Sequence, residues 1–155
     1  MRLIRRGLLA TLCAGAAAGA QPADDLVRVR STRDFTQTVR GLDSALAARN
    51  LTVFTRVDHA ANARGVNLEL RPTTLFVFGN PQVGTRLMQC AQTSGIDLPL
   101  KALVWEDSTR AVWVGYVAPA RLAERHALGE CREVLDRIDA VLSALAAAAA
   151  GTGRG

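Results

Sequence analysis

One run of residues, Thr73 to Phe78, constrains the fold of this 155-residue chain more than any other segment. Its sequence, TTLFVF, is almost continuously apolar or β-branched, which predicts a strand buried on both faces. Gly79 follows, and Asn80 and Pro81 are the residue types that begin helices at the N-cap and the first helical position. A buried strand that leads directly into a helix is typical of an α/β domain.

Short β-rich runs and stretches with helical spacing alternate along the rest of the chain. Further strands are expected at 26–30, 51–57, 101–106 and 111–117. Helices are expected from a cap at Ser31 or Thr32 to near Asn50, as a short turn that ends at Gly65, from Pro81 to Gly95, and from Pro119 with an interruption at Gly129. This order predicts a single two-layer α/β domain over residues 21–150, with a mixed β-sheet, helices packed on it and a C-terminal helix.

Two local details extend this prediction. Residues 107–110 form a polar turn, so 101–106 and 111–117 are expected to pair as a hairpin with residues 106 and 111 opposite each other. That register places Val104 and Trp113 on one face. The alanine-rich end, 146–155, offers little side chain to bury, so we expect it to fray, with 151–155 as a disordered tail.

The first 20 residues have the layout of a secretory signal peptide. Three arginines precede an apolar stretch, and Ala18-Gly19-Ala20 forms a small-residue cleavage motif. The apolar stretch is shorter than the roughly 20 residues that a spanning helix needs, which disfavours the alternative of a membrane anchor. We therefore expect a periplasmic or secreted chain that begins at Gln21 and has no stable membrane span.

Charge argues against a nucleic-acid partner. The full chain has 19 basic and 14 acidic side chains, but three of the basic ones lie in the predicted signal peptide. The other basic residues are scattered among acids, and all of them are arginine except Lys101. A basic patch typical of nucleic-acid binders is therefore not predicted.

Two of the three cysteines, Cys90 and Cys131, remain after the expected cleavage. In an oxidising compartment such a pair favours a structural disulfide, which we expect here. Two free thiols and a metal or redox site are the alternatives.

The middle of the chain carries a series of short motifs. They are Val57-Asp58-His59-Ala60-Ala61, Arg71-Pro72-Thr73-Thr74-Leu75, Phe78-Gly79-Asn80-Pro81, Gly84-Thr85, Asp97-Leu98-Pro99-Leu100-Lys101, Trp105-Glu106-Asp107 and Val112-Trp113-Val114-Gly115-Tyr116. In order and spacing they resemble the family called domain of unknown function 302, over roughly residues 35–128. The resemblance implies an α/β fold and a tendency to form homodimers, and it implies no established activity.

Candidate ligand-binding residues lie near the ends of the strands. Gly79 and Asn80 place a helix N-terminus where backbone N–H groups favour an anion, with a simple helix cap as the alternative. His59 follows Asp58, which suggests either an oriented general base or a structural pair. Lys101 is the single lysine, which favours a site that needs a compact ammonium group, although chance retention is the alternative.

The hairpin and the last helices supply the other candidates. Trp105 and Tyr116 either line a ligand pocket or belong to the core and a dimer surface. Glu106 is a candidate acid or base, and His126 a candidate ligand-binding histidine. No spacing matches a known metal motif, so no metal and no cofactor are predicted, with haem or metal on a histidine left open.

These candidates favour a non-catalytic ligand-binding or accessory protein that takes a small molecule or an anion. The alternatives are a small periplasmic enzyme using His59, Lys101 or Glu106, and a haem or metal protein using His59 or His126. Bulky apolar residues on both faces of the hairpin predict a homodimer, because the helices of one domain cover a single face. The pocket is expected where His59, Asn80 and Lys101 approach the hairpin.

Overall fold

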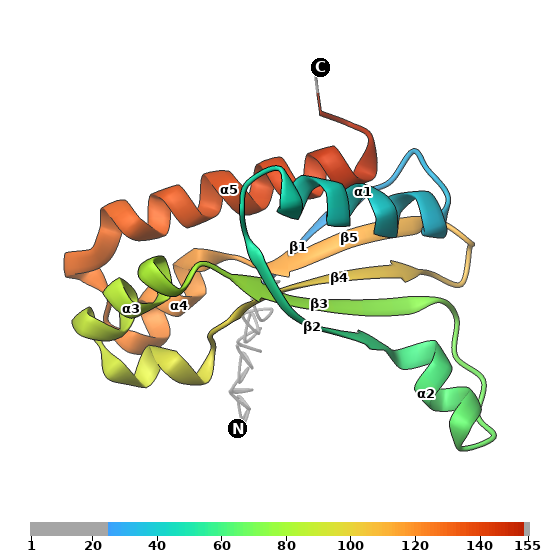
Figure 1. Ribbon diagram of the computed structural model, residues 1–155, viewed down its shortest axis with the longest axis horizontal. Coiled ribbons are helices and arrows are strands. Elements are labelled where there is room, and N and C mark those ends of the chain that lie inside the picture. The colour runs from blue at the N-terminus through green and yellow to red at the C-terminus, as the bar shows by residue number, and fades with distance from the viewer. Residues whose placement is uncertain (1–24, 154–155) are drawn as a thin grey trace, which may run out of the picture.

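A five-stranded sheet with helices on one face forms the framework of residues 25–153, the part of the chain that the computed structural model describes (Figure 1). The expected signal peptide lies outside the described residues. The strands are β1 (Leu26–Arg30), β2 (Thr52–Asp58), β3 (Thr73–Gly79), β4 (Leu100–Glu106) and β5 (Val112–Val117). The helices are α1 (Phe35–Ala47), α2 (His59–Gly65), α3 (Pro81–Cys90), η1 (Gln92–Ile96), α4 (Pro119–His126), η2 (Gly129–Cys131) and α5 (Arg132–Ala150), where η marks a 3₁₀ helix.

The strands lie in the order β1-β5-β4-β3-β2, and each neighbouring pair is antiparallel. The two-layer α/β fold is as predicted, but the expectation of a mixed sheet is wrong. A parallel pair requires a connection that crosses back over the sheet. Here α3 and η1 lie beyond the end of β3, so the chain turns there and β4 returns antiparallel to β3 (Figure 1).

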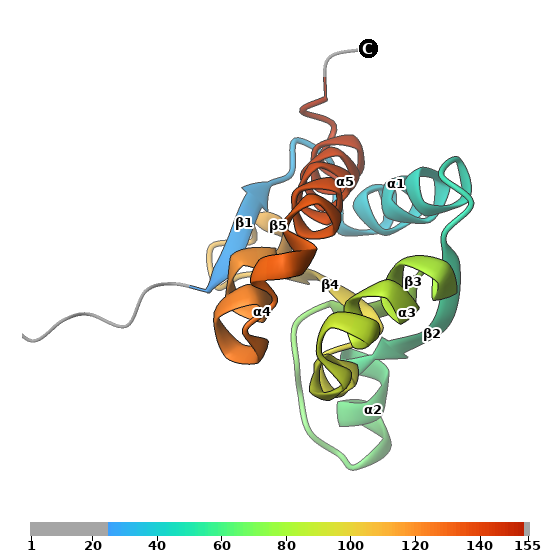
Figure 2. The same cartoon turned by 90° about the vertical axis from the view of Figure 1, so that its left-hand side faces the viewer.

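The helices α1 and α5 pack side by side on one face of the sheet (Figure 2). Phe76 and Phe78 of β3 point toward these helices and are fully buried, whereas Leu75 and Val77 point to the other face and are only partly buried. The expectation that this strand is buried on both faces is therefore wrong. The core lies between the sheet and the two helices.

The β4–β5 hairpin has a different register from the one expected. Trp105 lies opposite Trp113 and Val104 opposite Val114, because the connecting loop includes Ala111. Val104 and Val114 face the helices and are fully buried. Since side chains alternate along a strand, both tryptophans lie on the other face, with ring centroids 6.4 Å apart.

The N-cap of α1 is a different residue from the two that were expected. Asp34 is the N-cap, and its carboxylate accepts a hydrogen bond from the Gln37 backbone N–H at 2.7 Å. The Gln37 side chain accepts from the Asp34 N–H, which completes a capping box. The expected caps, Ser31 and Thr32, instead contact Thr38 and the end of α5 through their hydroxyls.

The alanine-rich end of α5 is packed rather than frayed. Ala146, Ala149 and Ala150 are buried against α1, where Gly41 leaves so little space that a Cβ atom would lie 3.0 Å from the Ala149 carbonyl oxygen. Small side chains bring the two helix backbones close together, so the expected fraying is wrong for these residues. Residues 151–153 form the helix cap, and the last two residues of the expected tail lie outside the described residues.

The expected disulfide is present. Cys90 at the end of α3 is bonded to Cys131 of η2, with Cα atoms 6.4 Å apart. It therefore fastens α3 to the start of α5. Within residues 25–153, none of the helices has the length and apolarity that crossing a membrane requires.

Candidate functional site

The carboxylate of Asp97 joins two parts of the chain that are distant in sequence. Its Oδ1 lies 3.0 Å from a guanidinium nitrogen of Arg125, and its Oδ2 lies 2.7 Å from Nε2 of His126. The other ring nitrogen of His126 lies 3.1 Å from the Thr93 hydroxyl, and the imidazole is only 5% exposed. Asp97 and Thr93 therefore connect the η1 segment to the C-terminal end of α4.

Lys101 lies beside this cluster. Its Nζ donates to the backbone carbonyl oxygens of Asp97, at 2.8 Å, and Pro99, at 3.0 Å. No carboxylate among residues 25–153 forms an ion pair with this ammonium group. Lys101 therefore contributes a positive charge that neutral carbonyl groups orient and do not neutralise.

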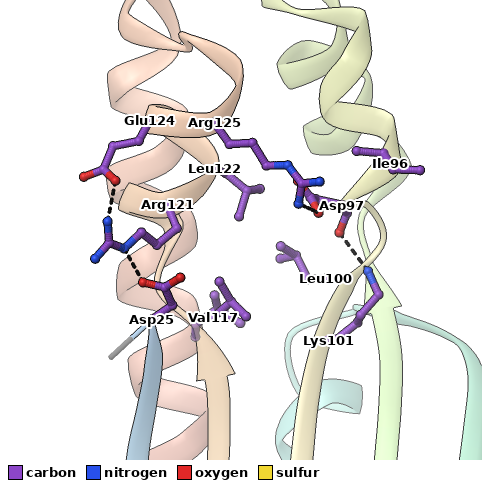
Figure 3. A pocket seen from close by; sticks show the side chains of 11 residues that line it. Asp25, Ile96, Asp97, Leu100, Lys101, Val117, Arg121, Leu122, Glu124 and Arg125 are labelled. Carbon is purple, nitrogen blue, oxygen red and sulfur yellow. Dashed lines mark hydrogen bonds and ion pairs between the residues drawn. The ribbon is translucent and has the colours of Figure 1, made fainter. Parts of the chain in front are cut away.

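Asp97 and Lys101, with the Arg125 guanidinium that reaches Asp97 from α4, form one wall of a cavity of about 780 Å³ (Figure 3). The opposite wall comes from α4 and the adjoining ends of β1 and β5, where Arg121 lies between two carboxylates. Its Nε is 2.6 Å from Asp25, and one of its terminal nitrogens is 2.6 Å from Glu124. The hydrogen bond with Glu124 and the charge of Asp25 raise the pKa of Arg121 above its ordinary value.

The space between the walls has an apolar floor. Figure 3 shows Leu100, Leu122 and Val117 pointing into the gap between the two charged groups, and Leu142 of α5 also lines the cavity. Charged rims around an apolar floor suit a small molecule with a hydrocarbon body and polar ends.

Gly79 and Asn80 belong to a second, apolar groove of about 410 Å³. Asn80 is the N-cap of α3, as predicted, and its Oδ1 accepts from the Gln82 N–H at 2.9 Å. Leu100 lines both this groove and the charged cavity, so Asn80 and Lys101 lie in neighbouring depressions at the same end of the sheet.

His59 and Glu106 lie at the other end of the sheet. Asp58, which precedes His59, pairs with Thr74, whereas the residue before Asn80 pairs with Thr52 at the start of β2. The expected convergence of His59, Asn80 and Lys101 is therefore wrong, because antiparallel strands place the residues that follow β2 and β3 at opposite ends. The Asp58 carboxylate caps α2 by accepting from the Ala61 N–H at 2.8 Å, and within residues 25–153 no hydrogen bond or ion pair joins it to the His59 side chain.

The aromatic candidates do not share a pocket. Trp105 lies on the sheet face away from α1 and α5, whereas Tyr116 is buried beneath α5. Burial raises the pKa of the Tyr116 phenol, the nearby charge of Asp139 raises it further, and a hydrogen bond with Ser143 acts in the opposite direction. Tyr116 thus belongs to the core, which was the alternative to a position in a ligand pocket.

The histidines also lie apart, since His59 begins α2 and His126 ends α4. In the part of the chain that the structure describes, no group of three or more His, Cys, Asp or Glu side chains is arranged to hold a metal ion.

Residues 27–145 match the model of the family described as "Domain of unknown function DUF302". The match runs from the second residue of β1 through most of α5, and it includes every residue that lines the charged cavity except Asp25. The chain belongs to the DUF302 family.

Curated relatives of this DUF302 domain carry the name of a channel. The protein "Fluoride-specific ion channel FluC 1" of Brucella suis is 46% identical over 109 residues, which cover 70% of this chain and 43% of that protein. "Fluoride-specific ion channel FluC 2" of Brucella melitensis is also 46% identical, with 40% of its length covered. The chain therefore spans less than half the length of these relatives.

The fold matches a solved DUF302 structure. The crystal structure of an "uncharacterized conserved protein DUF302 from Bacillus stearothermophilus" superposes with a TM-score of 0.73 at 19% identity, over 80% of this chain and 97% of that one. This likeness supports the fold.

Sequence reasoning about the DUF302 domain named Lys101 and His126 but missed the other charged residues around them. Arg121, Glu124 and Arg125 recur three and four positions apart on α4, which is a visible sign of one charged helix face. Asp97 lies within one of the motifs that resemble the family, yet nothing in its sequence neighbourhood indicates that α4 packs against it. That contact depends on how η1 and α4 meet in space.

Proposed function

We propose that this protein is a non-catalytic binding protein of the periplasm or the secreted fraction, and that the charged cavity holds its ligand, a small organic anion. The observation that carries the proposal is the Lys101 ammonium group, which backbone carbonyls hold at the rim of the cavity without a carboxylate partner among the described residues. An anion bound there would form a charge-assisted hydrogen bond, the strongest kind available to a lysine. The apolar floor would accept the body of the ligand.

The arrangement gives less support to the enzyme alternative. Its candidate residues His59 and Glu106 lie at the end of the sheet away from Lys101, so the three do not share one cavity. A haem or metal on His126 is also disfavoured, because Asp97 and Thr93 contact both of its ring nitrogens.

An accessory role is consistent with the relatives. The Brucella proteins named as fluoride-specific channels are more than twice as long as the segment that resembles this chain. In those proteins the segment similar to this chain is one part of a larger polypeptide, as is expected of a domain that assists another.

The proposed compartment rests on the signal-peptide pattern and agrees with the disulfide, because disulfides persist in oxidising compartments. Intact-mass measurement of protein from the native secreted fraction should give a chain that begins at Gln21. Retention of residues 1–20 in that fraction would contradict this compartment.

We also propose that the protein acts as a homodimer whose subunits meet through the sheet face opposite α1 and α5. This face carries Leu75, Val77, Leu103, Trp105 and Trp113, which are apolar and partly exposed. A second copy would cover them through sheet-on-sheet packing.

The ligand proposal is tested with protein purified without refolding. Mass spectrometry of the small molecules released on denaturation should detect an organic anion in stoichiometric amount. Adding this anion back should raise the melting temperature of the emptied protein and of Arg110→Met, which removes an exposed cation at the far end of the hairpin. The same anion should have no effect on Lys101→Met, and an equal effect on Lys101→Met would reject the proposed site.

A further inference from the structure

The two walls of the charged cavity differ in the sign of their charge. On the η1 and β4 side, the Asp97 carboxylate pairs with the guanidinium of Arg125, which reaches across from α4, and the Lys101 ammonium group adds a second cation that contacts only backbone carbonyls. This wall therefore has one positive charge in excess.

The opposite wall has the reverse balance. One guanidinium, that of Arg121, lies between two carboxylates, Asp25 and Glu124. The side chains of Asp25 and Glu124 are 58% and 64% exposed, so each carboxylate remains open to a further hydrogen-bond donor. This wall has one negative charge in excess.

Apolar side chains separate the two charged walls. Leu100, Val117 and Leu122 lie between them, with Lys101 on one side and Asp25 on the other (Figure 3). A bound molecule that reaches both walls must cross this apolar floor, so its charges have to be separated by a hydrocarbon segment.

We propose that the ligand of this cavity is a small zwitterion with its anionic group at Lys101 and its cationic group between Asp25 and Glu124. The inference rests on the proposed binding function and narrows its ligand class from organic anions in general to those that also carry a cationic group. A ligand with only a negative charge is attracted by the wall at Lys101 and repelled by the wall at Asp25 and Glu124. A ligand with only a positive charge is attracted by the wall at Asp25 and Glu124 and repelled by the wall at Lys101. A molecule with both charges is complementary to both walls, and such complementarity provides specificity.

The first test compares zwitterions of three chain lengths with compounds that carry a single charge. Calorimetric titrations use the emptied protein with β-alanine, γ-aminobutyrate and ε-aminocaproate, and with hexanoate and hexylamine, which match ε-aminocaproate in chain length. One of the amino acids should bind at least about tenfold more tightly than either single-charge compound, a margin of about 1.4 kcal/mol. Hexanoate binding as tightly as every amino acid would overturn the zwitterion inference and leave the anion-binding function intact.

The second test reverses the charge of one wall. Lys101→Glu should weaken binding of the best amino acid at least about tenfold, and it should create a preference for a diamine such as cadaverine. Arg110→Glu makes the same charge change outside the cavity and should leave the amino-acid affinity unchanged. Equal affinity of the amino acid for Lys101→Glu and wild type would reject the assigned anionic end.

The two proposals fail in different ways. Absence of binding by every amino acid in the series would overturn the zwitterion inference. Absence of any small molecule in the native protein would overturn the proposed function itself.

Discussion

Trp113 donates a hydrogen bond from its indole nitrogen to Asp107, with 2.8 Å between Nε1 and Oδ2. The other oxygen of the same carboxylate accepts from the Thr109 hydroxyl and from the backbone N–H groups of Thr109 and Ala111. One side chain therefore closes the β4–β5 turn and positions a tryptophan on the exposed face of the sheet. The hairpin register follows from this network.

The stability of the protein should depend on pH through Asp107. Hydrogen bonds from the side chains of Thr109 and Trp113 lower its pKa from 3.8 to about 2. Because the pKa of Asp107 is lower in the folded state than in the unfolded state, its ionised carboxylate stabilises the fold at pH values above about 4. This contribution should be lost as the pH falls from about 4 to about 2. Melting temperatures of Asp107→Asn should be lower than those of wild type at pH 7 and should converge with them near pH 2. Ser108→Ala, in the same turn, should show the wild-type pH dependence.

The disulfide should contribute substantially to stability. Removing it as Cys90→Ala/Cys131→Ala should lower the free energy of unfolding by roughly 2–5 kcal/mol, because the bond restricts the unfolded chain. Urea titration with fluorescence detection measures this loss. A reducing agent should destabilise the wild type and leave the double variant unaffected. Two free thiols in denatured, unreduced wild-type protein would contradict the assignment.

A side chain at Gly41 should destabilise the protein, although this residue lies inside α1, where alanine is ordinarily favoured over glycine. Alanine there adds helix propensity worth up to about 1 kcal/mol, but its Cβ would lie 3.0 Å from the Ala149 carbonyl oxygen, and overpacking typically costs about 1–3 kcal/mol. Gly41→Ala should therefore lower the free energy of unfolding by about 1 kcal/mol, measured by denaturant titration. Gly65→Ala, with open space around the added methyl group, is the control and should not destabilise.

The proposed dimer should depend on the sheet face opposite α1 and α5. Leu103→Glu places a charge at the centre of that face and should yield a monomer with an unchanged circular dichroism spectrum. Leu68→Glu makes the same substitution on a loop residue that is 64% exposed, and it should remain dimeric. Sedimentation velocity at micromolar concentration distinguishes these states, and a monomeric wild type would reject the proposal.

Local sequence signals were sufficient wherever a structure depends on residues close together in the chain. Asn80 and Pro81 predicted the start of α3, and the β-rich runs predicted all five strands to within a residue. Backbone hydrogen bonds, caps and side-chain periodicity act over a few residues, so these features can be read without a fold.

The sequence alone also pointed to Lys101, to the Cys90–Cys131 disulfide and to the DUF302 family. Three other features were decided by tertiary structure: the antiparallel sheet, the packing of Ala149 against Gly41, and the meeting of Asp97 with α4. Each depends on the direction in which the chain returns after an element ends. Neighbouring residues do not specify that direction, because it is set by the burial of apolar faces on segments far apart in the sequence.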